Sequence, residues 1–417
     1  MNDDLPDLRA IDVADVYKGD VLAGQLAREG NDVVFRYAAA YVANETVSPV
    51  ARTLPLGPDP VRATAGSVPA FFAGLLPEGL RLRAIVTGTR TSEDDHLTLL
   101  LAVGQDAIGD VRVVPAGATP PPPVPTLEQR RVADVDLVEV FTEAISISSA
   151  RFERMALPGV QAKVSAAMVS TPIGTSTGPA ILKLNPPGGH PHLVENEHFF
   201  LTMAAACGLP APVHRLVHDR TGRSGLLVAR FDRVPAAGGR FRRLAQEDAC
   251  QILGAYPAAK YRLTTEGVAR ALAGMVEEGD GSRPLALRRV FELVAFSYLI
   301  GNGDLHGKNF SARVNPEGIA EITPVYDLVS TQPYLSWRDP MALNLYGRAG
   351  RLTRGHLLQS AERLGLRGPA LGGALDRICD SAAPWIERLD SIGFDDRTTA
   401  LLTDLLRARI AELGRRE

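Results

Sequence analysis

Residues 296–310 read FSYLIGNGDLHGKNF and join an apolar segment to a polar, glycine-rich loop. The apolar residues before Gly301 have helical spacing, and glycine is a common residue at the end of a helix. Asp304 and Asn309 follow in the loop, five positions apart. We therefore expect a helix that ends near Gly301 and a loop that presents one carboxylate and one amide.

The spacing D-x-x-x-x-N is typical of the catalytic loop of protein kinases, where the aspartate accepts the proton of the attacking hydroxyl and the asparagine binds magnesium. After this loop, FSARV and IAEITPVYD flank the turn NPEG, which predicts a hairpin that ends close to Asp327. A carboxylate there would be a second ligand for the Mg²⁺ that neutralises the phosphates. Asp304 and Asn309 would be better explained as a helix-capping pair if Asp327 were absent.

Two glycine-rich phosphate loops do not fit this stretch. The Walker A pattern fails because the spacing is one residue too long and because Asn309, rather than Ser or Thr, follows Lys308. The G-x-G-x-x-G pattern also fails by one residue, and both motifs should follow a strand. The glycines at 301, 303 and 307 are compatible either with turn chemistry or with phosphate contact.

A lysine in an apolar strand is the second candidate. Lys183 lies within ILKL, where a cation is costly unless it is paired or reaches solvent from an edge strand. Kinases pair such a lysine with a helix glutamate, for which Glu197 is our first candidate and Glu195 our second. Upstream, GVQAK at 159–163 could place backbone amides and Lys163 over the phosphates.

The proline-rich stretch 115–126, PAGATPPPPVPT, predicts a linker. We expect a small β-rich domain at 1–114, a β-rich nucleotide-binding lobe at 127–235 and an α-helical catalytic lobe at 236–417. Together these predict an α+β fold of the bilobal, protein-kinase-like kind, although the order of lobes is by itself only an analogy.

Local patterns predict individual elements. Residues 68–86 and 127–150 have helical character, and VENEHFFLTMAAACG should be a helix that stops at Gly208. AKVSAAMV and PAILKLNPP should pair across the turn TPIGTSTG, and APVHRLVH and GLLVARFDR across DRTGRS. The second hairpin would bring Arg230, Phe231 and Asp232 between the lobes, either beside an adenine edge or as a packing and ion-pair cluster.

Composition excludes several classes of protein. The 417 residues are 45% hydrophobic and 22% charged with a formal net charge of −3, which is typical of a globular protein without a general attraction to nucleic acid or anionic membranes. The three cysteines lack disulfide or zinc spacing, and no secretory signal or membrane-spanning run is visible. We expect a soluble, cytoplasmic protein.

Seven segments in order resemble the HipA toxin kinases: GVQAK, ILKL, NEHFF, VARFDR, RLAQEDACQ, GNGDLHGKNF and PVYDLVS. LPLGPDP and FFAGLLPEG are similar to the small first domain of that family, so the resemblance covers nearly the whole chain. It implies an ATP- and Mg²⁺-dependent serine/threonine kinase that acts as the toxin of a toxin–antitoxin pair. QEDACQ is a family-like signature whose Gln246-Glu247-Asp248 could begin a capped helix.

The resemblance also implies residue roles. Asp304 looks like the catalytic base, and Asn309 and Asp327 look like the magnesium ligands. The implied ATP-binding set is Gly159, Val160, Gln161, Ala162, Lys163, Lys183, Ala229, Phe231, His306, Gly307, Lys308 and Tyr326, with Glu197 as the ion-pair partner of the lysine. The implied partners are a HipB-like helix-turn-helix antitoxin and a protein substrate such as an aminoacyl-tRNA synthetase, with DNA reached only through the antitoxin and no membrane.

One position departs from the family pattern. Ala156 stands where the best-known members carry a serine that is autophosphorylated, so that form of self-inactivation is not expected here. Two alternatives stay open. GDLHGKN also resembles the loop of aminoglycoside and choline kinases, which would make the chain a small-molecule phosphotransferase. A catalytically inactive partner of a DNA-bound repressor is the other.

Overall fold

The N-terminal part of the chain forms an antiparallel sheet with the strand order β4-β3-β2-β1-β5. The computed structural model describes residues 7–120, 136–145, 168–175, 178–186 and 188–414. The strands are β1 (Val13–Lys18), β2 (Val21–Glu29), β3 (Asp32–Tyr37), β4 (Val61–Ala63) and β5 (Val111–Pro115). Their apolar face packs on the helices α1 (Ala39–Val42), α2 (Ala70–Gly74), α3 (Gly79–Thr89) and α4 (His96–Val103).

The helical character predicted over 68–86 is present, but as two helices, because α2 and α3 are separated by residues 75–78. Pro77 explains the break: its ring disfavours helical backbone at the residue before it and it has no N–H to donate. Glu78 is extended, and Gly79 has a φ of +58°. After the break, Glu78 lies beside Lys260 and Lys308 of the C-terminal part, and Arg81 at the start of α3 contacts Ser170 of the second sheet.

A second sheet follows, with the order β6-β7-β9-β8. Its strands are β6 (Val169–Thr175), β7 (Gly178–Leu184), β8 (His214–His218) and β9 (Ser224–Ala229). Both predicted hairpins are present, but the first is shifted. Most of the predicted turn TPIGTSTG belongs to β6, whose β-branched residues pair with β7.

Two helices flank this sheet. α6 (Leu193–Ala206) runs where it was predicted, and Gly208 after it has a φ of +83°, which suits glycine at a helix end. Of the helix predicted over 127–150, α5 (Leu137–Ile145) is described, and the remainder lies outside the described residues. The predicted first-strand residues 162–167 and the loop 159–163 also lie outside them.

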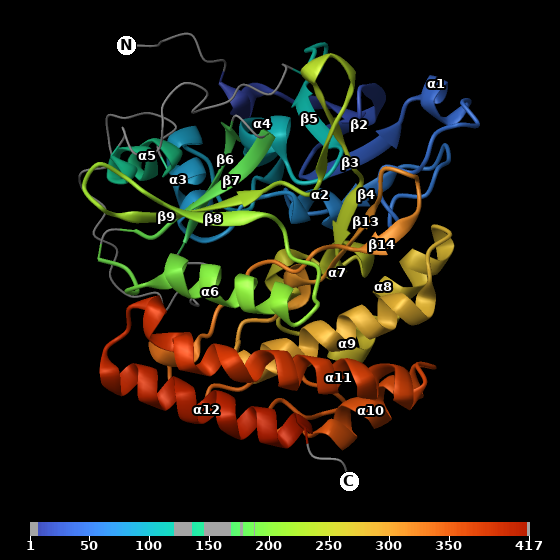
Figure 1. Cartoon of the computed structure of the whole chain (residues 1–417). Helices are drawn as coiled ribbons and strands as arrows, with labels where there is room; N and C mark the ends of the chain where they lie inside the picture. The colour runs from blue at the N-terminus through green and yellow to red at the C-terminus, as the bar shows by residue number, and fades with distance from the viewer. Residues whose placement is uncertain (1–6, 121–135, 146–167, 176–177, 187, 415–417) are drawn as a thin grey trace.

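The C-terminal part is mainly helical. Figure 1 shows its long helices layered on one side of the molecule, away from the two larger sheets. They are α7 (Ala249–Ile252), α8 (Thr265–Glu278), α9 (Arg283–Ile300), α10 (Arg354–Arg363), α11 (Gly368–Ala382) and α12 (Asp396–Gly414). The predicted hairpin around NPEG is present as β13 (Ser311–Val314) and β14 (Ala320–Ile322), and β12 (Gln246–Asp248) adds a strand to it. A short ribbon, β10 (Arg233–Pro235) with β11 (Phe241–Arg243), follows β9.

The predicted α+β class is therefore confirmed, while the domain boundaries proposed from the sequence stay predictions. Helix α3 joins two cores, since Ile85 is buried with the N-terminal sheet and Ala84 with the β6–β9 sheet. This shared helix ties the N-terminal part firmly to the second sheet. None of the described helices combines the length and apolar character that a membrane crossing requires.

Candidate active site

The loop after α9 is held in one shape by its own polar groups. Gly301 ends the helix with a φ of +75°, as the sequence predicted. The Asp304 amide donates to Asn302 Oδ1 at 2.9 Å, and Asn309 Nδ2 donates to the Asp304 carbonyl at 3.2 Å. Asp304 and Asn309 thus do share a local capping-like contact, but the asparagine contacts the backbone carbonyl of Asp304 and not its carboxylate.

Gly307 is required by packing. A Cβ atom there would come within 2.5 Å of the Leu263 side chain and 2.9 Å of Cys250 Sγ on α7. Gly307 does not line the cavity described below. Its predicted contact with ATP therefore finds no support, and close packing accounts for the glycine.

Asp304 is 3% exposed, and Tyr261 Oη donates a hydrogen bond of 2.8 Å to its Oδ1. The tyrosine comes from the segment before α8, and its neighbour Lys260 accepts the Gly307 amide at 3.0 Å through its carbonyl oxygen. Burial and the nearby Asp304 raise the pKa of Tyr261, so the tyrosine remains a donor. Sequence reasoning missed Tyr261, which lies 43 positions from Asp304 and carries no motif of its own.

Lys183 meets two carboxylates. Its Nζ lies 2.6 Å from Glu197 Oε1 on α6 and 2.9 Å from Asp327 Oδ1. Burial opposes the charge of the lysine, but Asp327 and Glu197 outweigh it and raise the pKa of Lys183, which stays protonated. Lys183 in turn lowers the pKa of Asp327 against the effect of burial. The lysine therefore pairs with Glu197, the first candidate, and not with Glu195. Burial raises the pKa of Glu197 to about 7 despite this pairing.

These residues surround a cavity of about 390 Å³, a size typical of sites for small ligands. Lys183 on β7 and Glu197 on α6 line it from one side, and Ala229 at the end of β9 and Phe231 after it also line it. The other predicted residues on its wall are His306, Lys308, Asn309, Tyr326 and Asp327. Asp304 is not among the lining residues, and 159–163 cannot be placed because they lie outside the described part of the chain.

Asn309 and Asp327 carry the amide and carboxylate oxygens that Mg²⁺ prefers as ligands. Both line the cavity, and Asp327 has a side chain that is 23% exposed, with a second oxygen beyond the one that meets Lys183. No group of three His, Cys, Asp or Glu side chains within the described ranges could hold a metal alone. That agrees with the way Mg²⁺ is usually held, by one or two protein oxygens together with substrate phosphates and water.

His306 is neutral at physiological pH. Burial, with a smaller effect of Lys260, lowers its pKa to about 4. Its ring meets Tyr261 edge to face at 5.1 Å, and its Nδ1 is buried without a hydrogen-bond partner in the parts of the chain that are described. A neutral imidazole in the cavity wall can accept or donate one hydrogen bond to a ligand.

The break between α2 and α3 brings the N-terminal part into the cavity. Glu78 forms ion pairs there with Lys260 and, at 3.7 Å, with Lys308. Lys308 Nζ also donates to the Gly74 carbonyl at 2.8 Å and lies 3.6 Å from Asp248 Oδ2. Lys308 was predicted to neighbour the phosphates, and in this structure its charge is already balanced by two carboxylates.

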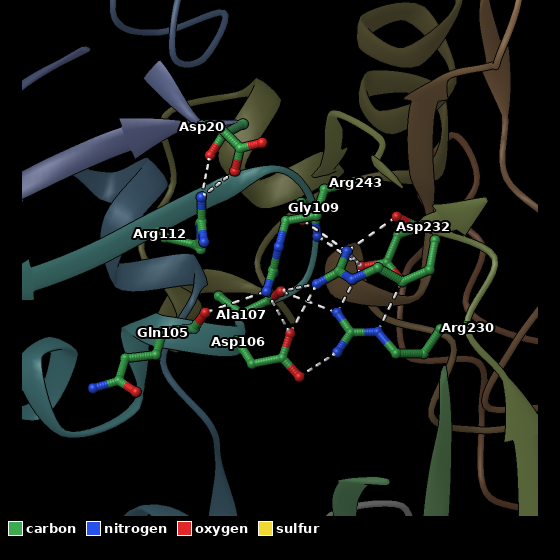
Figure 2. A network of polar contacts seen from close by, with 11 residues as sticks. Asp20, Gln105, Asp106, Ala107, Gly109, Arg112, Arg230, Asp232 and Arg243 are labelled. Atoms are coloured by element: carbon green, nitrogen blue, oxygen red, sulfur yellow. Dashed lines mark hydrogen bonds and ion pairs between the residues drawn. The ribbon is translucent and has the colours of Figure 1, made fainter. Parts of the chain in front are cut away.

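The segment after β9 is fixed by a buried ion-pair network (Figure 2). Asp232 binds Arg230 at 2.8 Å and Arg233 at 2.7 Å, and all three side chains are 3% exposed or less. Asp106 from the N-terminal part contacts the same two arginines at 2.9 and 3.0 Å. Arg230 and Asp232 therefore form the ion-pair cluster, and they line the cavity together with Ala229 and Phe231.

The QED segment caps α7 as the signature suggested. The Asp248 side chain accepts from the Gln251 amide at 2.9 Å, and Gln251 Oε1 accepts from the Asp248 amide at 2.9 Å, which completes a capping box. Glu247 beside it is buried, and its Oε1 accepts from the Arg52 amide at 3.0 Å. Burial raises the pKa of Glu247 to about 7 despite that hydrogen bond.

Glu247→Gln should flatten the pH dependence of stability. The raised pKa means that the folded protein holds a proton that the unfolded chain loses above about pH 4.5, so this group's stabilising effect is lost as pH rises to about 7. Urea unfolding at several pH values should show the wild type losing up to about 3 kcal/mol more than the variant across this window. The exposed Glu45→Gln is the control, and parallel profiles for all three proteins would contradict the prediction.

Comparison with known proteins agrees with this geometry. The family model for the HipA-like C-terminal domain matches residues 155–386, and the model for the HipA N-terminal domain matches residues 14–114. A Sinorhizobium fredii protein named "Putative kinase Y4mE" is 26% identical over 390 residues, which are 90% of this chain and 91% of that protein. The Serine/threonine-protein kinase toxin HipA of Shewanella oneidensis is 26% identical over 79% of this chain and 77% of its own length.

A solved structure shares the fold. It contains HipA of Shewanella oneidensis with HipB and operator DNA, and its matched chain has a TM-score of 0.76 and 22% identity, covering 96% of this chain and 97% of that one. The C-terminal family model alone spans more than half of the 417 residues. This chain belongs to the HipA family and is a kinase of that family.

Proposed function

We propose that this chain is an ATP- and Mg²⁺-dependent serine/threonine kinase that acts as the toxin of a HipA/HipB-like toxin–antitoxin pair. The observation that carries the catalytic part is the meeting of Lys183, Glu197 and Asp327 in one cavity beside the loop that holds Asn309 and Asp304. A lysine–glutamate pair, a metal-binding aspartate and a base–asparagine loop are the parts that phosphoryl transfer uses.

Each residue has a distinct role in this proposal. Lys183, kept protonated by its two carboxylates, binds nucleotide phosphates, and Glu197 orients it. Asp304 accepts the proton of the substrate hydroxyl, held in position by Tyr261. Ala229 and Phe231 bind the adenine, and Asn309 and Asp327 hold Mg²⁺. When bound, the metal neutralises and aligns the phosphates.

Two features of the cavity wall bear on nucleotide binding. Lys260 and Lys308 are paired with Glu78, so either lysine would have to leave that carboxylate before it could contact a phosphate. His306 is neutral and would serve as a hydrogen-bonding group. We assign Lys183 to the phosphates first because it lies beside Asp327, the proposed magnesium ligand, and pairs with a helix glutamate as kinase lysines do.

The partners follow from the relatives. The related Shewanella oneidensis protein is named a toxin, and its solved structure includes HipB and operator DNA. By extension we propose a HipB-like antitoxin as the partner here, contact with DNA through that antitoxin, and a translation component such as an aminoacyl-tRNA synthetase as the substrate. A cytoplasmic location is part of the same proposal.

Growth of a bacterial host tests the toxin function. Induced wild-type protein should arrest growth and produce a new phosphoserine or phosphothreonine on a host protein, whereas Asp304→Asn at equal expression should do neither. Coexpression of the cognate antitoxin should restore growth. Equal growth of both strains without a new phosphoprotein would contradict the toxin function, and phosphate transfer to an amino alcohol or sugar instead would favour a small-molecule kinase.

A further inference from the structure

Arg81 of the N-terminal part lines the cavity from the first turn of α3. It lines the cavity together with Ser170 and Lys183, and its Nη1 donates to the Ser170 carbonyl at 3.0 Å. Ser170 is the cross-strand partner of Lys183 on β6 and β7. Arg81 therefore lies against the same strand pair that carries the proposed phosphate-binding lysine.

Arg81 differs from the other arginines near the cavity because no described carboxylate lies within ion-pair distance of it. The acidic group that raises the pKa of Arg81 through space is Asp106. Asp106 is already committed, with Oδ2 2.9 Å from Arg230 and Oδ1 3.0 Å from both Arg233 and Arg243. Loss of hydration lowers the pKa of Arg81 and outweighs the opposing effect of Asp106.

Arg81 and Arg230 both line this part of the cavity, but Arg230 is already paired with the Asp106 and Asp232 carboxylates. Lys183, Lys260 and Lys308 on the same wall are paired as well. Among the described residues that line the cavity, Arg81 is therefore the one cation without a carboxylate at ion-pair distance. A guanidinium also matches the geometry of a phosphate, to which it can donate two parallel hydrogen bonds.

We propose that Arg81 binds the phosphate chain of the nucleotide, so that the N-terminal part of the chain contributes directly to the nucleotide site. This inference rests on the proposed function, since it requires ATP in the cavity. It also assigns a role to the break between α2 and α3. Helix α3 starts directly after the break, so its first residues reach the cavity. Of the two arginines on α3, Arg81 lines the cavity and Arg83 does not.

Isothermal titration of the full chain with ATP, ADP and adenosine tests this role. Arg81→Gln should weaken the affinity for ATP and ADP about 10- to 100-fold, because hydrogen bonds to a charged group are lost. The affinity for adenosine should stay unchanged. The ATP affinity of Arg81→Lys should lie between those of the wild type and Arg81→Gln, because lysine keeps the charge but not the planar, two-donor geometry of the guanidinium. Arg83→Gln is the matched control, since Arg83 is on the same helix and does not line the cavity.

The outcomes separate this proposal from the proposed function. If Arg81→Gln binds ATP like the wild type while Lys183→Ala does not, the nucleotide site stands and the role of Arg81 is overturned. If Arg81→Gln loses affinity for ATP and for adenosine by the same factor, Arg81 shapes the cavity and does not bind phosphate. If the wild type itself binds no ATP, both proposals fail. Circular dichroism and melting temperature without nucleotide show whether each variant is folded.

Discussion

Replacing Asp304 by asparagine is expected to abolish phosphoryl transfer while ATP affinity stays at its wild-type value. An amide cannot accept the proton of a substrate hydroxyl, and general-base catalysis contributes about 10²- to 10⁴-fold to a rate. Asparagine has nearly the same shape, and its oxygen can still accept the hydrogen bond from Tyr261. Asp304 does not line the cavity, so nucleotide binding should be spared.

Turnover and affinity must be measured on the same preparation. Transfer of labelled phosphate to a host lysate or purified substrate gives kcat, and titration with ATP gives affinity. Tyr261→Phe is the companion variant: it removes the 2.8 Å hydrogen bond but keeps the carboxylate, so it should reduce kcat much less than Asp304→Asn. An Asp304→Asn protein with wild-type kcat would remove Asp304 from the catalytic step.

Asp232→Ala should cause the largest loss of stability among the ion pairs described. The change leaves Arg230 and Arg233, whose side chains are 2% and 3% exposed, without their closest carboxylate. Breaking a buried pair in this way costs about 3–5 kcal/mol, because the remaining charges stay desolvated. The network holds the pKa of Asp232 at about 2, against the effect of burial, so the loss should be full at neutral pH.

Asp20→Ala is a matched control for that experiment (Figure 2). Asp20 binds Arg112 at a similar 2.7 Å, but its side chain is 97% exposed. Exposed pairs contribute about 0–1 kcal/mol, so the urea midpoint and melting temperature should barely move. Similar losses for the two variants would show that burial does not set the strength of the Asp232 network. A large loss only for Asp232→Ala would confirm that this network fastens the N-terminal part to the segment after β9.

Much of the local structure could be predicted because short stretches of sequence encode it. The end of α9 at Gly301, the end of α6 at Gly208 and the hairpin around NPEG each depend on residues a few positions apart. The partner of Lys183 was also predictable, because a buried lysine needs a counter-charge and the following helix offered Glu197 first. The β6 boundary was wrong because TPIGTSTG contains turn-forming residues that strand pairing overrode.

The sequence by itself determined the α+β class, the family and the chemical types of the candidate site, because these depend on periodicity and on motifs of adjacent residues. Only the tertiary structure decided which distant residues complete the site. Tyr261 meets Asp304, Glu78 meets Lys260, and Arg81 reaches the cavity across 89 positions to Ser170. Such contacts are selected by how whole elements pack, and a charged residue on a helix looks the same in sequence whether it faces water or a cavity.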